Sequence, residues 1–197
     1  MPRFKPLERF SALAVTTVFS IALSSCVVAE DPPPVVTGAK RMFASSTKVN
    51  GNIGGLSGAD ALCATWAQAA DLGGSWKAFL SATGVNAISR INDVGPWYNV
   101  NRQQKIFNNK TGFTVGAQNA IRTEYGTGAT GDAWTGTKAD GTANGANHCG
   151  NWTSGNTSAY GSIGSPGSSL SAGTAWMAEA GNIPSCTTTL RVYCIEQ

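Results

Sequence analysis

The sequence predicts a mixed α+β fold that contains a long polar loop region held in place by disulfide bonds. Apolar residues at helical spacing indicate a helix over residues 57–70. Alternating apolar and polar residues indicate a strand over residues 189–195. Residues 126–173 are rich in Gly, Ser, Thr and Asn, and a loop region of that length needs something to pin it. One domain is therefore expected over residues 40–197.

A secretory signal peptide is expected over residues 1–25. The basic residues Arg3, Lys5 and Arg9 precede the apolar run FSALAVTTVFSIAL, which is the order of charge and apolarity found in signal peptides. This run is too short, and too interrupted by Ser and Thr, to form a stable transmembrane helix. The sequence therefore predicts export.

The stretch LSSC, which ends at Cys26, resembles the lipobox of bacterial lipoproteins. We expect Cys26 to carry the lipid and to anchor the protein in the cell envelope, at the outer membrane and cell surface. The alternative is a secreted protein cut after Ala29, because the stretch VVA also fits ordinary signal peptidase. Either route leaves four of the five cysteines, an even set for disulfides in an oxidising compartment.

A proline-rich tether is expected over residues 26–39, since three consecutive prolines favour an extended spacer. The three basic residues of the leader against Glu8 contribute +2 of the formal net charge of +3, which leaves the rest of the chain close to +1. This balance excludes the basic surface of a nucleic-acid-binding protein. Only 13% of the residues are charged, so Ser, Thr, Asn and Gly are expected to supply a polar surface suited to glycans or proteins.

The first strand is expected over residues 40–46, with Met42 and Ala44 on one face and Arg41 and Phe43 on the other. The stretch GNIGG then makes a turn. The helix is expected to begin at Ser57, which with Asp60 has the shape of a capping box, and to stop at the stretch GG. Its apolar face consists of Ala59, Leu62, Cys63, Trp66, Ala67 and Ala70.

Shorter strands are expected over residues 75–81, 97–100 and 113–115. The last strand is expected to bury one face, made of Leu190, Val192 and Cys194.

The four remaining cysteines allow three pairings, and their spacing alone does not choose among them. Packing favours a bond between Cys63, on the apolar face of the helix, and Cys194, on the inner face of the last strand. Cys149 and Cys186 would then pin the loop region at both ends.

Several stretches resemble the endostatin family. GGLSGADALC, AADLGGSWKAFLS, AWTGTKADGT, HCGNW and LRVYCIEQ occur in the order found in the endostatin domain of collagens XV and XVIII. They look still closer to the bacterial endostatin-like outer-surface lipoproteins. The resemblance covers residues 40–197 and implies a C-type-lectin-like fold with two helices, an antiparallel sheet and a long loop region. It also implies the disulfides Cys63–Cys194 and Cys149–Cys186.

The resemblance does not extend to the metal and sugar sites of these families. The zinc site of endostatin depends on N-terminal histidines, whereas the single histidine here is His148, beside Cys149. Neighbours on an extended chain point to opposite sides, so these two do not form a ligand pair. The Glu-Pro-Asn and Trp-Asn-Asp motifs of calcium-dependent sugar-binding lectins do not occur. We therefore expect neither a zinc site nor a lectin-type sugar site.

A ligand loop is indicated by Asp132, Trp134, Asp140, Asn144 and Trp152, within the densest polar and aromatic stretch. Its Asp and Asn side chains are hard oxygen donors that Ca²⁺ accepts, so a weak calcium site is one interpretation. The interpretation we favour is that the Asp-Gly and Asn-Gly pairs make turns. The two tryptophans are expected to form a small core under the loop rather than a ligand platform.

A heparin-type basic cluster is a second candidate site. It would consist of Arg90, Arg102, Lys105, Lys110 and Arg122, provided that these residues converge in space. The alternative is a set of scattered, solvated charges, which the near-neutral balance favours.

These features predict a non-enzymatic, adhesin-like binding module for extracellular matrix proteins or glycans. The single histidine lies beside a cysteine expected in a disulfide, and the spacing of Asp132, Asp140 and Glu179 is not typical of a glycosidase. No cofactor is expected, and no membrane contact beyond the lipid anchor. The alternatives are a structural envelope lipoprotein without a dedicated ligand and a calcium-independent carbohydrate-binding protein.

Overall fold

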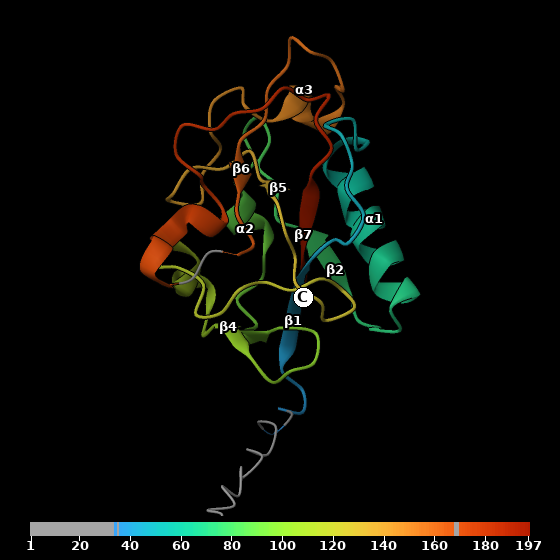
Figure 1. The fold of residues 1–197 in the computed structure, drawn as a ribbon, viewed down its shortest axis with the longest axis vertical. Coiled ribbons are helices and arrows are strands. Elements are labelled where there is room, and N and C mark those ends of the chain that lie inside the picture. The colour runs from blue at the N-terminus through green and yellow to red at the C-terminus, as the bar shows by residue number, and fades with distance from the viewer. Residues whose placement is uncertain (1–33, 35, 168–169) are drawn as a thin grey trace, which may run out of the picture. The chain divides into compact units, whose positions relative to one another are not determined.

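Strand β7 (Arg191–Glu196) lies at the centre of the sheet in the computed structural model (Figure 1). Along one edge it pairs antiparallel with β1 (Lys40–Ala44). Along the other edge it pairs antiparallel with β2 (Trp76–Ala78) and then parallel with β5 (Ala133–Trp134). All six residues of β7 are buried, so the strand is covered on both faces.

The structure describes residues 34, 36–167 and 170–197. The expected signal peptide, the lipidation site Cys26 and most of the expected tether lie outside these residues. Within the tether, the Val36 N–H donates to the Arg102 carbonyl at 3.3 Å. No helix in the described ranges is long and apolar enough to cross a membrane.

The remaining strands extend the sheet on both sides. β3 (Trp97–Tyr98) pairs parallel with β1, and β4 (Lys105–Phe107) pairs antiparallel with β3. On the other side, β6 (Ile163–Gly164) pairs antiparallel with β5. The expected antiparallel sheet is therefore confirmed only in part, since the β1–β3 and β5–β7 pairs are parallel. Long connections separate the strands of both pairs, as parallel pairing requires.

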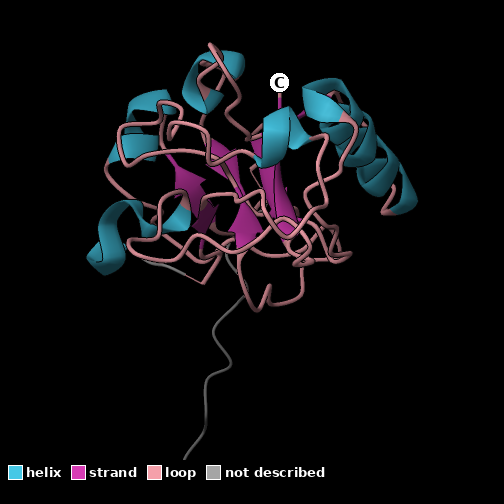
Figure 2. Cartoon of the chain, turned by 90° about the horizontal axis from the view of Figure 1, so that it is seen from above, coloured by secondary structure: helices cyan, strands magenta, loops and turns pink. Residues whose placement is uncertain are grey.

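One helix, α1 (Gly55–Ala69), is much longer than the others and lies beside β2 and β7 (Figure 1). The other α-helices, α2 (Ala87–Arg90) and α3 (Cys149–Trp152), span four residues each. Two 3-10 helices, η1 (Lys110–Thr114) and η2 (Leu170–Trp176), cover other parts of the chain. Figure 2 shows the strands in the centre with helices and loops around them. The described residues thus form the mixed α+β structure that the sequence predicts.

Helix α1 buries the face that its spacing predicts, but its start differs from the expectation. It begins at Gly55, after Gly54 with a left-handed φ of 85°, and no side chain caps it. The capping role expected for Asp60 is wrong because its carboxylate accepts the Ala78 N–H at 2.8 Å and binds the Arg90 guanidinium. Asp60 therefore connects α1 to β2 and α2. The buried residues of α1 are Ala59, Cys63, Trp66 and Ala67.

The strand expected over residues 113–115 is instead part of the 3-10 helix η1. The Asn109 side chain accepts a hydrogen bond from the Gly112 N–H at 3.1 Å and starts this helix. Packing then fixes the segment, because the Phe113 side chain is fully buried. Its ring contacts the rings of Phe79, Trp97, Phe107 and Trp176.

Alternation along β1 and β7 divides the core into two clusters, one on each face of the sheet. On the α1 face, Phe43 and Val192 pack with the buried residues of the helix. On the opposite face, Met42 and Tyr193 pack with an aromatic group around Trp176. The faces expected for both strands are confirmed. β7 also buries a second face, which its alternation did not predict.

Two disulfides hold this arrangement. Cys63–Cys194 joins α1 to β7 across 131 residues of sequence. Cys149–Cys186 closes the loop region across 37 residues. These are the pairs favoured by packing and implied by the endostatin resemblance. In the chain-entropy model, loops of these lengths contribute about 4–5 kcal/mol each as an upper bound.

A buried ion pair fixes β1 to the end of β7. Arg41 Nε and Nη2 donate to the two carboxylate oxygens of Glu196 at 2.7 and 2.9 Å. The Arg41 backbone N–H donates to the same carboxylate at 2.9 Å. Only 7% and 9% of the two side chains is exposed, and the guanidinium lies 5.4 Å from the centroid of the Trp76 ring. The pair therefore links β1, β2 and β7 at one point.

Replacing Glu196 by Gln should destabilise the fold by about 3–5 kcal/mol, because the Arg41 charge stays buried without its partner. Urea denaturation followed by tryptophan fluorescence measures this change. The matched control is Asp71→Asn, at an exposed position with a φ of 53° that Asn tolerates. It should stay within about 0.5 kcal/mol of the wild type. Equal, small effects in both variants would contradict the structural role of the pair.

Candidate functional site

Trp134 and Trp152 lie under the predicted ligand loop and belong to the core. Both side chains are fully buried, and their ring centroids are 6.0 Å apart. Trp134 Nε1 donates to the Val49 carbonyl at 2.9 Å, and Trp152 Nε1 donates to the Ser81 carbonyl at 2.7 Å. The prediction that these rings form a small core is confirmed, and neither offers a surface to a ligand.

Asp140 forms a turn at the tip of the loop. Its carboxylate accepts a hydrogen bond from the Thr142 N–H at 2.9 Å and a second from the Thr142 hydroxyl. These two bonds lower the pKa of Asp140, and the nearby charge of Lys138 lowers it further. Gly141 has a φ of 82°, and a Cβ there would meet Ile88. The favoured interpretation of the Asp-Gly pair as a turn is confirmed.

Asn144 lies in a groove of about 240 Å³ between the predicted loop and the chain that follows η2. Its Nδ2 donates to Ser162 Oγ at 2.8 Å, and its backbone N–H donates to the Gly136 carbonyl at 2.9 Å. Two exposed apolar side chains lie nearby. Ile183 lines the groove, and Tyr160 pairs with Ser185 next to it. We call this groove the loop groove, defined by Thr137, Lys138, Asn144, Ser162, Glu179 and Ile183.

Asp132, at the start of β5, lies beside a carboxyl group that the sequence did not connect to it. Its backbone carbonyl accepts the Arg191 N–H of β7 at 3.1 Å. Burial, the charge of Asp132 and a hydrogen bond with Asp132 together raise the pKa of Glu179. Burial, followed by the charges of these two carboxyl groups, also raises the pKa of Tyr193 well above its usual value. The Tyr193 hydroxyl is buried and has no hydrogen-bond partner among the described residues.

His148 is a structural residue at the start of α3. Its Nδ1 accepts the Asn151 N–H at 2.9 Å, so Nε2 carries the proton and faces Thr83 Oγ1 at 3.2 Å. Cys149 is in a disulfide. Within residues 34, 36–167 and 170–197, no three His, Cys, Asp or Glu side chains converge as a metal site. The weak calcium site of Asp132, Asp140 and Asn144 stays a prediction, while Asp140 accepts from Thr142 and Asn144 donates to Ser162.

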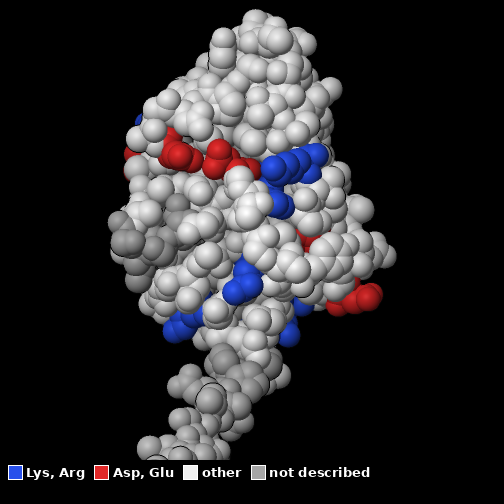
Figure 3. Space-filling model, viewed as in Figure 1, with Lys and Arg blue, Asp and Glu red and all other residues white. Residues whose placement is uncertain are grey.

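The five predicted basic residues do not form one cluster. Arg90 binds Asp60 at 2.7 Å and donates to the Ala78 carbonyl, so its charge is neutralised and its place in the cluster is wrong. Arg102, Lys105 and Arg122 do lie around the β3–β4 turn. Arg122 Nε donates to Gln104 Oε1 at 3.0 Å, and the Arg102 N–H donates to the Asn99 carbonyl. Lys110 is the first residue of η1, which packs against β4. Figure 3 shows that charges are sparse on this face and that the region over α3 has none.

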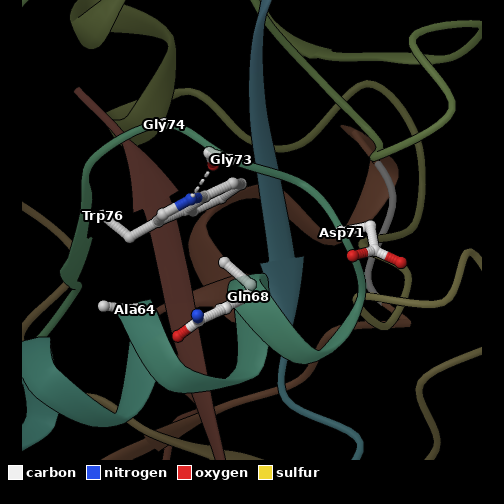
Figure 4. A pocket seen from close by; sticks show the side chains of 7 residues that line it. Ala64, Gln68, Asp71, Gly73, Gly74 and Trp76 are labelled. Carbon is white, nitrogen blue, oxygen red and sulfur yellow. Dashed lines mark hydrogen bonds between the residues drawn. The ribbon is translucent and has the colours of Figure 1, made fainter.

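A groove of about 460 Å³ lies between α1 and the loop that precedes β2 (Figure 4). Its floor is the Trp76 ring, which is 6% exposed and donates from Nε1 to the Gly73 carbonyl at 2.7 Å. The other side chains that line it include two alanines and Gln68. A further groove, of about 320 Å³, lies between β4 and η1 and is rich in amides. The sequence predicted neither groove, because each joins segments whose own patterns indicated only helix or strand.

The loop groove has the most varied chemistry of the three. Its hydroxyl, amide, ammonium and carboxylate groups come from Thr137, Asn144, Lys138 and Glu179. By contrast, the groove beside α1 is lined largely by alanine, glycine and a covered tryptophan. A few convergent polar groups are what fixes the orientation of a ligand. The loop groove is therefore the candidate binding site.

Comparison with known proteins assigns the chain to a family. A family model described as a protein of unknown function (DUF1554) matches residues 46–169. This match covers more than half of the chain, so the chain belongs to the DUF1554 family. The matched segment contains α1, β5 and Asn144, and it ends before Glu179 and β7. A search of curated proteins finds no match.

Replacing Trp152 by Phe should destabilise the fold by about 1–3 kcal/mol, because the Ser81 carbonyl loses its hydrogen-bond donor inside the core. Urea denaturation measures the loss. The exposed substitution Lys138→Gln is the control and should leave stability nearly unchanged. If Trp152→Phe left stability intact, the assignment of this ring to the core would be wrong.

Proposed function

We propose that this protein is a surface-anchored, non-enzymatic binding module that recognises extracellular proteins or glycans through the loop groove. The observation that carries this proposal is the composition of the groove. It combines polar groups at Asn144, Ser162 and Glu179 with the exposed apolar side chain of Ile183. The exposed ring of Tyr160 belongs to the neighbouring segment, where Tyr160 pairs with Ser185. Mixed surfaces of this kind, with an aromatic anchor beside adaptable polar contacts, are typical of recognition sites.

The rigidity of the loops supports the same function. Cys149–Cys186 closes the segment that carries Tyr160, Ser162 and Ile183. Under it, Trp134 and Trp152 anchor the loops to the core through their indole hydrogen bonds. A preorganised surface loses less conformational entropy when it binds than a mobile loop does. The groove therefore resembles a fixed recognition surface.

The endostatin resemblance supports the proposal at the level of class. It implies a C-type-lectin-like fold for residues 40–197, in which a long loop region stands on a frame of helix and sheet. The described structure shares the α+β composition and the two disulfides that the resemblance implies. The bacterial lipoproteins of that family include adhesins for host matrix glycoproteins. We propose a similar role for this chain.

Export and a lipid anchor at Cys26 belong to the same proposal. The expected signal peptide and the lipobox-like LSSC stretch support an envelope location. The proline-rich tether would hold the domain away from the membrane. The loop groove would then face the extracellular medium, where glycoproteins and glycans occur.

The full oxidised chain should bind immobilised laminin, fibronectin or heparin in a saturable manner, measured by surface plasmon resonance over a salt series. Replacing Tyr160 by Ser should weaken binding about tenfold or more, because exposed tyrosines are frequent hot spots in interfaces. The matched control is Tyr125→Ser, which removes an exposed tyrosine from a different turn. It should leave the affinity unchanged.

Saturable binding that is lost with Tyr160 and retained without Tyr125 supports the proposal. A double variant, Arg102→Glu with Lys105→Glu, tests whether the ligand binds the basic residues around the β3–β4 turn instead of the loop groove. Only binding through these charges depends steeply on the salt concentration. Absence of saturable binding to all three ligands would contradict the adhesin-like function. That result would favour an envelope lipoprotein without a dedicated ligand.

A further inference from the structure

The last residues before β1 are bound to the turn between β3 and β4. The Val36 N–H donates to the Arg102 carbonyl at 3.3 Å, and Arg102 Nε donates to the Ala39 carbonyl at 3.0 Å. These two bonds hold residues 36–39 against the turn. Figure 1 shows β1 and β4 at the lower end of the domain and α3 at the opposite end. The segment that leads back to Cys26 therefore departs from the β3–β4 turn.

Two further basic residues lie at the same turn. Lys105 is the first residue of β4 and directly follows Gln104. Arg122 Nε donates to Gln104 Oε1 at 3.0 Å, and the Arg122 N–H donates to Asn99 Oδ1 at 2.9 Å. The Asn99 carbonyl in turn accepts the Arg102 N–H at 2.8 Å. Hydrogen bonds of the turn thus bring the three basic residues together.

The charges of Arg102, Lys105 and Arg122 have no carboxylate partner in the part of the chain that the structure describes. Their side chains bind neutral acceptors instead, and Lys105 Nζ, for example, donates to an asparagine oxygen at 3.0 Å. Glu124 is close to Arg122 in sequence, but it is only 2% exposed and accepts hydrogen bonds from a serine that follows β1. The positive charge at the turn is therefore available to an external anion.

Two exposed apolar side chains accompany these charges. Tyr125 is 59% exposed and Val36 is 39% exposed. The segment of Tyr125 lies against the β3–β4 turn, because Arg122 Nη1 donates to the Gly126 carbonyl at 3.3 Å and a Cβ on Gly126 would lie 3.8 Å from the Val100 side chain. We call this surface the base, defined by Val36, Arg102, Lys105, Arg122 and Tyr125.

We propose that the base binds the anionic surface of the membrane to which the chain is anchored. Ten residues separate Val36 from Cys26, so the chain between them spans at most about 36 Å. The base is thus the part of the domain nearest to the anchor. Lys and Arg are attracted to anionic headgroups, and tyrosine favours the headgroup level, where its ring meets apolar surroundings and its hydroxyl meets water. This contact goes beyond the lipid anchor, the one membrane contact that the sequence predicted.

Contact at the base would direct the recognition surface away from the bilayer. Tyr160 lies beside α3, at the end opposite β4, because the Cys149 N–H donates to the Tyr160 carbonyl at 3.0 Å (Figure 1). The inference deepens the proposed function by giving the domain an orientation, and it rests on anchoring through Cys26. It does not require that the loop groove have a ligand.

Coupling the full oxidised chain to vesicles through Cys26 places the anchor without depending on lipidation in a cell. Four of the five cysteines form the two disulfides, so a lipid that carries a maleimide reacts with Cys26 alone. A chain that cells do not lipidate would contradict the anchoring proposed above. The coupled vesicles would still test the base, so the two failures are distinguishable.

Two exposed tyrosines serve as positions for matched fluorescent reporters, Tyr125→Trp at the base and Tyr160→Trp beside α3. The natural tryptophans are at most 9% exposed, so their emission is a constant background. On brominated phosphatidylglycerol vesicles the added emission of Tyr125→Trp should be quenched. High salt, or phosphatidylcholine in place of phosphatidylglycerol, should abolish the quenching, because salt screens exposed charges. Tyr160→Trp should not be quenched in either lipid.

Charge substitutions in the Tyr125→Trp background locate the contact. Arg102→Asn and Lys105→Gln should each lower the ratio of docked to undocked domain about fivefold, which is the effect of one basic residue near an anionic surface. Asn tolerates the φ of 56° at position 102. Lys48→Gln is the matched control, since this exposed lysine lies beyond the other end of β1. It should leave the ratio unchanged.

Absence of quenching of Tyr125→Trp on phosphatidylglycerol at low salt would overturn the proposal, and so would equal quenching of both reporters. The salt and lipid comparisons need no charge substitution, so they decide the question even if Arg102→Asn fails to fold. Soluble heparin is a further arm of the test. If heparin binds the wild type more tightly than Lys105→Gln and the vesicles cause no quenching, the basic residues bind a soluble polyanion and the membrane contact is wrong.

Discussion

The structure depends on the burial of β7 on both of its faces. A strand in that position must be hydrogen-bonded along both edges and packed against side chains on both faces. Different parts of the chain provide the pairing and the packing. β1, β2 and β5 supply the pairing, while α1 and the aromatic group around Trp176 supply the cover. Cys194 and Glu196 then lock the strand to α1 and β1 through a disulfide and a buried ion pair. Segments from both ends of the sequence are thereby held in one core.

The same strand positions the loop groove. β5 pairs parallel with β7, and β6 extends from β5 towards the groove. β6 can approach the chain after η2 because it contains Gly164, where a Cβ would overlap the Trp176 carbonyl. That close approach brings Glu179 next to β6, where its N–H donates to the Ile163 carbonyl. The groove is therefore a consequence of packing against the central strand.

Few residues of this protein are charged, and two pairs of them form buried or partly buried salt bridges. Two ion pairs, Arg41–Glu196 and Asp60–Arg90, join secondary-structure elements within the described residues. Elsewhere the loops are stabilised by turns, indole hydrogen bonds and a disulfide, which leaves an uncharged surface over α3 (Figure 3).

The sequence by itself determined the features whose chemistry acts within a few residues. These are the buried face of α1, the alternation of β7 and the turn at Asp140, because helical period, strand period and side-chain hydrogen bonds are local. It did not determine the start of α1 or the helical form of η1, where Asp60 and Phe113 are engaged by distant partners. Only the tertiary structure decided the parallel strand pairs, the ion pair of Arg90 with Asp60 and the position of Glu179 beside β6. These depend on which strands become neighbours in the sheet, and that choice comes from burying both faces of β7 rather than from any spacing along the chain.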